Sequence, residues 1–387
     1  MKILLGGIPL GCDNIGDEAI LSCVVKMMRE IAPSAELSVA TNDPSTAEIL
    51  GVSVVPPYGF AGTSLEGFDA AIRAFDAYVW CGATGLSDYP LVALDLLRRA
   101  QAVGVRTFVW AVGMDSELNP VFFRAHGLRR RLLACLGAVG LYERLLKRRL
   151  STLIRRTLPK CGGVWMRDSE SAAVLAEFGF EDAKVAADTA IRQSRDIGSQ
   201  ASLFRESDRS VCHPTLGICL SSQRAVTDTA GVERFLERMS SAGVMVVGIP
   251  MNPKTDAAFM RSVGVADVFE GTTPDAVARK AASCDLILSS RLHLLILAAN
   301  VGTPVMGIAR GSKLANWLAN FGETTVGSVS SCDWDELAKV VIARLSDSRL
   351  RERFALVRDA AYAKLDARLS LAQADFAARL LGKSDGC

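Results

Sequence analysis

A cation and an imidazole stand together at the start of an apolar helix predicted late in the chain. An apolar strand ends at Ser289 and Ser290, and Arg291 and His293 open the helix that follows. Such groups are costly to bury unless they meet an anion or a paired carboxylate. The pattern predicts an anion site, in which the guanidinium, the hydroxyls and the helix-start amides hold phosphate or carboxylate and His293 donates a proton. The alternative is an arginine tied to a buried aspartate and a histidine satisfied in the core.

A second group of polar residues follows an earlier predicted strand. Arg167 and Asp168 come directly after the apolar stretch "GGVWM", and Asp188 emerges in the same way one unit later. Asp168 also occupies the position of a helix N-cap, which explains it without any further function. Arg167 lies where a buried strand ends. We expect Arg167 and Arg291 to hold a doubly anionic small molecule from the two sides of a cleft.

A glycine-containing loop, "GCDNIGDEAI", joins the first predicted strand to the first predicted helix. The helix start offers unpaired N–H groups to an anion, although Asp17 and Glu18 also favour a helix N-terminus through the helix dipole alone. The loop has neither the Lys-Ser/Thr of a P-loop nor the G-x-G-x-x-G spacing of a dinucleotide-binding turn. The pattern therefore argues against nucleotide binding of these two kinds.

These residues need a scaffold that brings the carboxyl ends of several strands together. Short apolar, β-branched runs alternate with amphipathic helical patterns, which is typical of parallel sheets covered by helices. In a chain of 387 residues we expect two domains, over 1–200 and 211–387, joined by a polar linker from 192 to about 213. The expected fold is α/β, with two doubly wound Rossmann-like domains facing across a cleft and a helical tail from about Trp334. Ligands of such domains bind at the carboxyl ends of the strands.

Charge and cysteine content narrow the classes of partner. The 44 Lys and Arg against 42 Asp and Glu give a formal charge of +2, which indicates no nucleic-acid partner. The ten cysteines are irregularly spaced without a C-x-x-C, which favours reduced thiols in the cytoplasm. The apolar run after Lys2 is too short for a signal peptide, and no stretch of about 18 apolar residues is present to span a bilayer.

The segment 124–160 departs from this balance. It holds eleven Lys and Arg and one acid, Glu143, which gives it a formal charge of +10 interleaved with leucines. One expectation is that it lies on an anionic membrane surface, so that the protein is peripheral at the inner face of the membrane. The alternative is a basic helical face that is exposed to water or contacts another subunit.

The three polar stretches, in this order, resemble the polysaccharide pyruvyl transferase family. The matching positions are Asn14-Ile15-Gly16-Asp17-Glu18, then Arg167-Asp168 with Ser171 and Asp188, then Arg291-Leu292-His293 with Gly302-Thr303-Pro304. The likeness runs from the N-terminus to about residue 320. The chain departs from the family where Arg310-Gly311-Ser312-Lys313 keeps only the lysine of a Tyr-Asp-x-Lys stretch, and where "CGATG" replaces a triple glycine.

The resemblance implies a GT-B-like pair of domains, phosphoenolpyruvate as donor and a glycan as acceptor. If that glycan is lipid-linked, contact of the protein with a membrane would bring the two together. Catalysis falls to His293, with Asp168 and Asp188 as further candidate acids. Donor binding falls to Arg167, Ser289, Ser290, Arg291 and Lys313. Acceptor binding falls to Asn14, Gly16, Asp17 and Glu18, since a carboxylate beside the donor would repel it. No metal and no separate cofactor are expected, because no set of His, Cys and Asp has ligand spacing.

The chemistry of this transfer agrees with the residue types. Loss of phosphate requires protonation of the donor's methylene carbon, which leaves a cation on the adjacent carbon for a hydroxyl to attack. A histidine can supply that proton, and arginines can neutralise phosphate and carboxylate without losing their own. Two alternatives stay open. One is a GT-B-type glycosyltransferase that uses a nucleotide sugar, although the E-x-x-x-x-x-x-E pattern of many such enzymes is missing from the sequence. The other is a non-catalytic binding protein.

Overall fold

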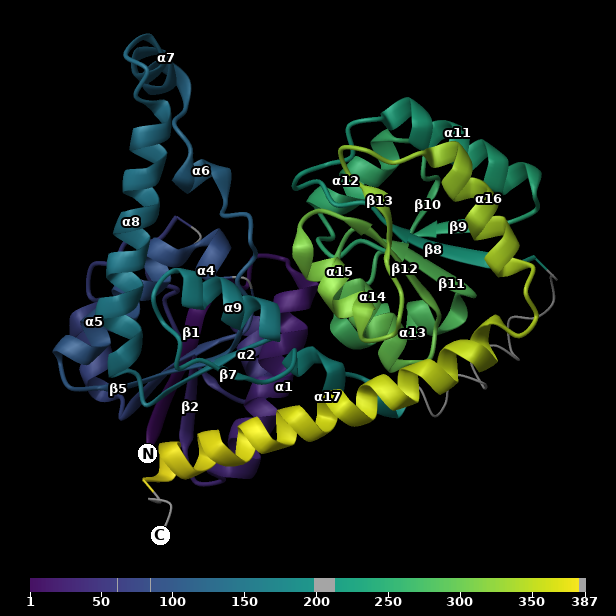
Figure 1. Ribbon diagram of the computed structural model, residues 1–387. Coiled ribbons are helices and arrows are strands. Elements are labelled where there is room, and N and C mark those ends of the chain that lie inside the picture. Colours follow the sequence, from purple (N-terminus) through teal and green to yellow (C-terminus); the bar gives the residue numbers. More distant parts are fainter. Residues whose placement is uncertain (61, 84, 198–212, 383–387) are drawn as a thin grey trace. The chain divides into compact units, whose positions relative to one another are not determined.

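The computed structural model describes residues 1–60, 62–83, 85–197 and 213–382 (Figure 1). Most of the linker expected over 192–213 therefore lies outside the described residues. The domain limits expected from the sequence, 1–200 and 211–387, stay predictions.

Parallel strands form two sheets, as the alternating pattern predicts. The first sheet contains β1 (Lys2–Leu10), β2 (Glu36–Thr41), β3 (Ser53–Val55), β4 (Ala77–Cys81), β5 (Arg106–Val112), β6 (Gly163–Met166) and β7 (Lys184–Val185). The second contains β8 (Thr215–Cys219), β9 (Met245–Gly248), β10 (Asp267–Val268), β11 (Leu286–Ser289), β12 (Val305–Ala309) and β13 (Thr325–Ser328). The sequence of β13, Thr-Val-Gly-Ser, is not an apolar, β-branched run of the kind that predicts a strand.

The strand order is that of doubly wound sheets. It is β3-β2-β1-β4-β5-β6-β7 in the first sheet and β10-β9-β8-β11-β12-β13 in the second. In each sheet the order reverses beside the first strand, between β1 and β4 and between β8 and β11. These switch points are where doubly wound folds form ligand crevices at the carboxyl ends of their strands.

Helices connect the strands and flank the sheets (Figure 1). The first half of the chain forms α1 (Ile15–Ile31), α2 (Pro44–Leu50), α3 (Phe68–Ala71), α4 (Gly85–Asp88), α5 (Pro90–Ala102), α6 (Pro120–Phe123), α7 (Gly127–Cys135), α8 (Val139–Thr157) and α9 (Ser169–Glu177). The second half forms α11 (Thr229–Ser241), α12 (Thr255–Ser262), α13 (Pro274–Ser283), α14 (Leu292–Asn300), α15 (Ser312–Ala319), α16 (Trp334–Leu345) and α17 (Leu350–Leu381). The 3₁₀ helices are η1 (Ile72–Ala74), η2 (Leu158–Lys160) and η3 (Thr189–Arg192). The predicted helical tail corresponds to α16 and α17.

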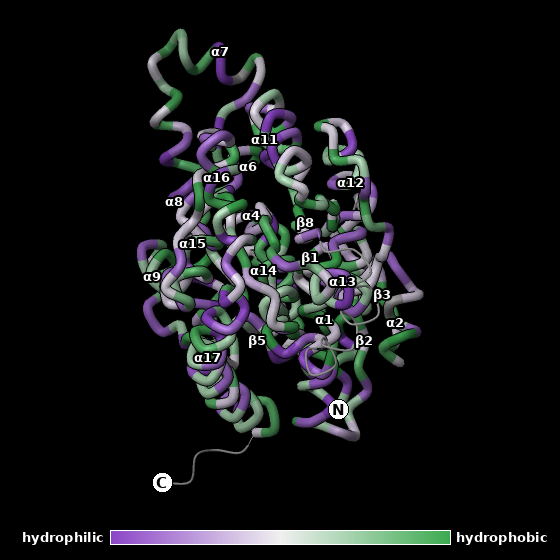
Figure 2. Tube along the Cα trace, turned by 90° about the vertical axis from the view of Figure 1, so that its right-hand side faces the viewer, coloured by the Kyte–Doolittle hydropathy of each residue, from purple (hydrophilic) through white to green (hydrophobic). Residues whose placement is uncertain are grey.

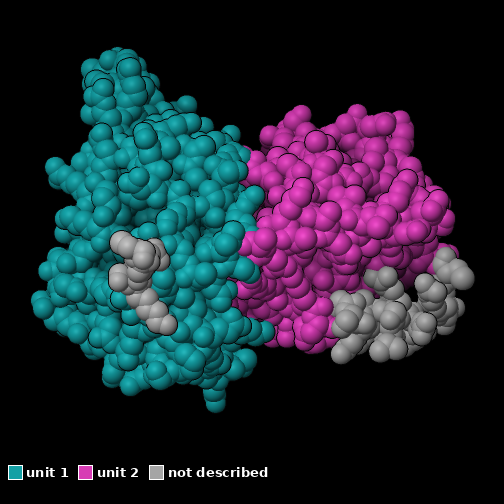
Figure 3. All heavy atoms as spheres, turned by 60° about the horizontal axis from the view of Figure 1, so that its bottom comes forward, with its two compact units in different colours: residues 1–12, 24–188, 368–387 teal, residues 13–23, 189–367 magenta. Residues whose placement is uncertain are grey.

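The chain divides into two compact units, coloured separately in Figure 3. Unit 1 consists of residues 1–12, 24–188 and 368–387, and unit 2 of residues 13–23 and 189–367. The division passes within α1 and within α17, so each of these helices contributes residues to both units. The start of α1, which carries the "DNIGDEAI" loop, belongs to unit 2.

Each unit has its own hydrophobic core. In unit 1, Phe376 of α17 packs edge-on against Phe108, Trp110 and Trp165 of the sheet. In unit 2, alternate residues of β8 and β11, such as Ile218 and Leu288, face α11 and α16. Helix α14 packs against β11 and β12 and is buried along its apolar length, as expected of a helix that is hydrophobic all round.

Helices α7 and α8 extend from the rest of unit 1 (Figure 1). The second half of α8 packs through Leu150 and Ile154, whereas α7 is largely exposed. Figure 2 shows hydrophilic and hydrophobic residues alternating along α7. Among the helices that the structure describes, none combines the length and the apolarity needed to cross a membrane.

Candidate active site

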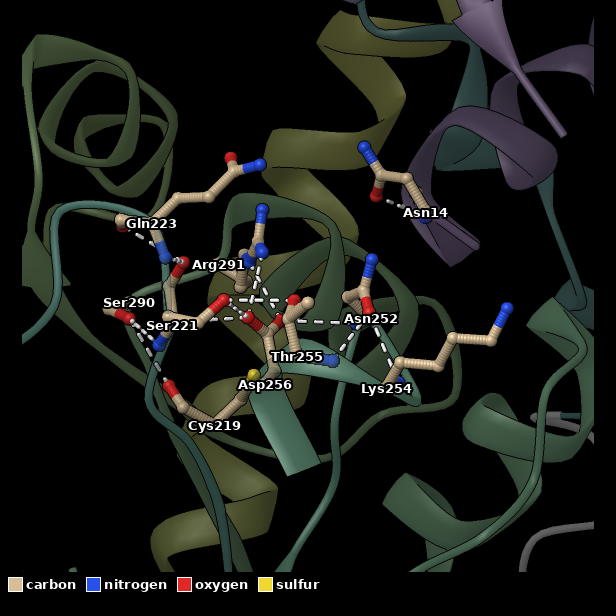
Figure 4. A network of polar contacts seen from close by, with 12 residues as sticks. Asn14, Cys219, Ser221, Gln223, Asn252, Lys254, Thr255, Asp256, Ser290 and Arg291 are labelled. Atoms are coloured by element: carbon tan, nitrogen blue, oxygen red, sulfur yellow. Dashed lines mark hydrogen bonds and ion pairs between the residues drawn. The ribbon is translucent and has the colours of Figure 1, made fainter. Parts of the chain in front are cut away.

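Arg291 is held by a buried aspartate of unit 2 (Figure 4). Its Nε donates to Asp256 Oδ2 at 2.9 Å and its Nη2 donates to Asp256 Oδ1 at 2.8 Å, a bidentate pair. Asp256 is fully buried in the first turn of α12 and also accepts from the backbone N–H groups of Ser222 and Asn252. Burial disfavours the charged guanidinium, but the hydrogen bonds and charge of Asp256 outweigh it and raise the pKa of Arg291. Arg291 thus has the buried aspartate partner that the sequence left open as an alternative.

The two serines before Arg291 hold the backbone of the strand ends. Ser289 Oγ accepts from Arg291 N and donates to Arg291 O, both at 2.9 Å. Ser290 Oγ accepts from Ser221 N at 2.9 Å and thereby ties the end of β11 to that of β8. Both serines are fully buried. These contacts shape the edge at the switch point, and a donor-binding role for the two hydroxyls stays a prediction.

His293 is the second residue of α14 and lies against the start of α1. A Cβ placed on Gly16 would overlap the His293 imidazole, so glycine is the residue that allows this close approach. Two contacts fix the loop before Gly16 within unit 2: Ile15 N donates to Met251 O at 3.0 Å, and Lys254 pairs with Asp13 at 2.7 Å. The structure therefore brings together the loop and the imidazole, 277 positions apart from Gly16 to His293, that the sequence singled out separately.

Asp17 shares this cluster with the predicted donor residues. It is buried in the first turn of α1 and accepts a 2.6 Å hydrogen bond from Asn14 Nδ2. Burial raises the pKa of Asp17, while the charges of His293, Arg291 and Lys313 and the bond from Asn14 act in the opposite direction. The loop predicted to bind the acceptor and the cations predicted to bind the donor therefore belong to one electrostatic neighbourhood. Glu18, next along the helix, is half-buried.

Two residues that the sequence did not assign complete this edge of unit 2. Asp256 fixes Arg291, and Arg310 donates through Nη1 to Ser221 Oγ at 2.5 Å and to Gln223 O at 2.9 Å. The sequence signal for Arg310 was that it stands where the family pattern has a different residue. The signal for Asp256 was weaker: it is an acid that follows a predicted strand, and an acid at a helix start is also explained by the helix dipole.

Arg167 and its neighbours form a separate group in unit 1. Arg167 is buried, its Nε donates to Asp168 Oδ2 at 3.0 Å, and its guanidinium lies where a Cβ on Gly113 would be. Burial disfavours the cation, yet the charges of Asp168, Asp188 and Asp115 raise the pKa of Arg167. The Arg167 guanidinium is thus paired with Asp168 and also feels the charges of Asp188 and Asp115.

Asp168 caps α9 as the sequence suggests. Its Oδ1 accepts from Ser171 N at 2.7 Å, and Ser171 Oγ in turn accepts from Met114 N. Burial opposes ionisation of Asp168, but Arg167 and Ser171 outweigh it and hold its pKa below the ordinary value. Because the ionised form of Asp168 is stabilised, this carboxylate is better suited to orienting Arg167 than to donating a proton. Asp188 is buried beside this pair. Catalytic roles for both acids stay predictions.

The comparison with protein families identifies the chain. The family model described as polysaccharide pyruvyl transferase matches residues 14–312, which include Asn14 to Glu18, Arg167, Asp168, Asp188 and Arg291 to His293 and end one residue before Lys313. The chain belongs to the polysaccharide pyruvyl transferase family. No curated protein shows significant similarity to this member of the family.

Solved structures share the fold of this pyruvyl transferase family member at low identity. A UDP-GlcNAc 2-epimerase from Neisseria meningitidis, bound to UDP-GlcNAc, has a TM-score of 0.58 at 12% identity and covers 96% of this chain and 100% of its own. The S. aureus MnaA–UDP co-structure has a TM-score of 0.57 at 9% identity and covers 91% of this chain and 90% of its own. The glycotransferase of kitacinnamycin has a TM-score of 0.56 at 13% identity and covers 97% of this chain and 98% of its own. The fold is therefore GT-B-like, as the sequence predicts.

Among the described residues, no group of three or more His, Cys, Asp or Glu side chains is arranged to hold a metal ion. The charged and titratable groups described at the unit 2 edge are the cations Arg291, Arg310 and Lys313, the imidazole of His293 and the carboxylate of Asp17. This set suits an anion with a nearby proton donor.

Proposed function

We propose that this protein transfers the pyruvyl group of phosphoenolpyruvate to a sugar hydroxyl and releases phosphate. The observation that carries the proposal is the position of His293, at the start of α14 against Gly16, where His293, Arg291 and Lys313 each interact electrostatically with Asp17. Family membership supports the same reaction class. An imidazole among cations at a switch point combines the two requirements of this chemistry, anion binding and proton donation.

Donor binding is assigned to the cations of the unit 2 edge. Asp256 occupies Nε and Nη2 of Arg291, so Nη1 is the group that this guanidinium would direct to the donor. Lys313, in the first turn of α15, adds a second cation, and the helix-start N–H groups supply hydrogen-bond donors to phosphate. A donor role for Arg167 of unit 1 stays a prediction. The charges of Asp168, Asp188 and Asp115 already act on its guanidinium within unit 1.

The reaction divides into balanced steps. His293, as imidazolium, gives its proton to the methylene carbon, and the electron pair of the double bond forms the new C–H bond, which leaves a cation at the phosphate-bearing carbon. A sugar hydroxyl adds to that carbon and loses its proton, for which the neutral imidazole is a suitable acceptor. The C–O bond to phosphate then breaks, the phosphate leaves with the bonding pair, and the same carbon is again a cation, stabilised by the sugar oxygen. A second hydroxyl that adds to this carbon and loses its proton to the leaving phosphate gives a ketal, whereas loss of a methyl proton gives an enol ether.

Asp17 is assigned as a positioning residue for His293. The Asp17 carboxylate interacts electrostatically with the imidazole, so it can hold the ring in place at the start of α14. The sequence alone assigned Asp17 to the acceptor, because a carboxylate repels an anionic donor. Its burial under Asn14 and its electrostatic interaction with His293 support the positioning role better. Acceptor contacts from Asn14, Gly16 and Glu18 stay predictions.

The test is phosphate release from phosphoenolpyruvate with a panel of sugar acceptors, together with mass spectrometry of the products. The proposal expects phosphate release that depends on an acceptor and a product heavier by one pyruvyl increment. Parallel reactions with nucleotide sugars address the alternative glycosyltransferase. Turnover of a nucleotide sugar with no effect of phosphoenolpyruvate would replace this proposal with that one.

A further inference from the structure

Exposed leucines gather on α7 and at its C-terminal end. Leu128 and Leu132 of α7 and Leu136, directly after it, are spaced at i, i+4 and i+8 and are 76%, 68% and 78% exposed. Leu141 and Leu145, spaced at i and i+4 on the first half of α8, are also more than half exposed. We call these five leucines the leucine stripe. Large apolar side chains clustered at this exposure mark a surface that contacts something other than water.

Cations flank the leucine stripe on both helices. On α7, Arg130 and Arg131 are exposed, and on α8 the exposed cations include Arg144 and Arg148, which lie three residues beyond Leu141 and Leu145. Glu143 is the one acid between residues 124 and 160. Long cationic side chains beside a leucine row can extend their charged ends outward while their stems cover apolar surface. The combination is that of a helix lying in a membrane interface.

We propose that α7 and the first half of α8 form a docking surface for an anionic lipid membrane. The leucine stripe enters the boundary between headgroups and acyl chains, and the flanking cations meet the negative headgroups. The surface is independent of the proposed transferase chemistry, because no residue of either polar group described above belongs to it. If that function holds, membrane docking would bring the enzyme to a lipid-linked glycan.

Charge argues against a second copy of the chain as the occupant. A two-fold dimer formed through this surface would place the same patch on both sides of the interface. Each side would bring six Lys and Arg, at positions 129, 130, 131, 144, 147 and 148, against the one acid Glu143, and apposed like charges disfavour association. An anionic bilayer instead supplies the opposite charge together with an apolar layer for the leucines.

The test is co-sedimentation of the full chain with vesicles. Vesicles of equal parts phosphatidylglycerol and phosphatidylcholine are expected to bind the protein, and vesicles of phosphatidylcholine alone are expected to leave most of it in solution. Binding should fall several-fold in about 1 M salt, where the Debye length shrinks to about 3 Å. Equal binding to both kinds of vesicle, or no binding to the anionic ones, would overturn the proposal.

Surface variants separate the two contributions without entering the core. L128S/L132S removes apolar contact, and R144E/R148E reverses two charges one helical turn apart; each is expected to lower anionic-vesicle binding at least about tenfold. The matched controls are L371S, at a leucine of α17 that is 73% exposed, and K364E/R368E, which reverses two exposed cations of α17 at the same spacing. The controls should bind as the wild type does.

Light scattering of the protein without lipid addresses the other occupant. The proposal expects the same oligomeric state for the wild type and for L128S/L132S. If the wild type formed an oligomer that dissociates in L128S/L132S, the surface would bind a second copy of the chain and the membrane proposal would be wrong. Vesicle binding is measured without substrates, so a protein that does not bind vesicles would not contradict the proposed transferase reaction. In the same way, a protein without transferase activity could still bind anionic vesicles.

Discussion

Gly16 packs so closely on the imidazole of His293 that no other residue fits at this position without a shift. A methyl group added there would push the imidazole away from the start of α14. Gly16→Ala is therefore expected to lower turnover strongly and to cost about 1–3 kcal/mol of stability, the usual range for overpacking. Steady-state phosphate release and urea unfolding measure the two effects.

The control for Gly16→Ala is Gly140→Ala on α8. A Cβ at Gly140 meets no atom within 4 Å, so alanine should leave turnover unchanged. If Gly16→Ala turned over at the wild-type rate, the contact with His293 would have no bearing on catalysis.

Removing the cation of the buried pair is expected to act on stability first. Arg291→Ala leaves the fully buried carboxylate of Asp256 without its guanidinium, and such a loss typically costs about 3–5 kcal/mol. The exposed pair of Arg349 and Glu352 supplies the control, because Arg349→Ala should change the free energy of unfolding by less than about 1 kcal/mol. Urea titration of both variants makes the comparison.

A double variant separates folding from donor binding at the same site. Arg291→Met with Asp256→Leu removes both charges, so we expect it to regain part of the stability lost in Arg291→Ala. Calorimetry should still show weakened binding of phosphoenolpyruvate. Wild-type affinity in the folded double variant would limit Arg291 to a structural role.

Loss of the imidazole is expected to affect the chemical step. His293→Ala should lower turnover about 100- to 10,000-fold, the usual range for a general acid, while calorimetry shows nearly unchanged donor affinity. His126→Ala, at an exposed histidine of unit 1, is the control and should be neutral. Near wild-type turnover of His293→Ala would make the imidazole a packing residue.

Asp17 and Asp168 are expected to respond to pH with opposite signs. Burial raises the pKa of Asp17 above its ordinary value of 3.8, so the folded state binds this proton more tightly, and stability is lost as pH rises through that pKa. Asp17→Asn should therefore raise the urea midpoint at pH 7, lose this advantage below pH 3.8, and lower turnover.

Asp168 provides the opposite case to Asp17, because its pKa is shifted downward. Its pKa is lowered because Arg167 and Ser171 outweigh burial, so its stabilising contribution is present above 3.8 and is lost as pH falls through the folded value. Asp168→Asn should lower the midpoint at pH 7. A lower midpoint for Asp17→Asn as well would show that the buried Asp17 carboxylate stabilises the fold, against the expectation.

Local sequence patterns predicted much of the fold. Apolar runs such as "TLGIC" and "DLILS" became β8 and β11 because a strand buried on both faces needs a continuous apolar stretch. The short strand β13 escaped this reasoning, since its residues are only half-buried and its pairing with β12 depends on a distant element. Polar residues at strand ends also led to the predicted site residues, because doubly wound sheets bind ligands at the carboxyl ends of their parallel strands.

The sequence by itself determined the residue types of the site, the α/β alternation and the order of motifs that defines the family. Only the tertiary structure decided which groups meet. Asp256 and Arg291 are 35 positions apart, and no local pattern specifies that one carboxylate receives that guanidinium. The start of α1 follows the first strand in sequence but groups with unit 2, where Gly16 meets His293. Partners of this kind depend on how elements pack in three dimensions, and local propensity carries no record of that packing.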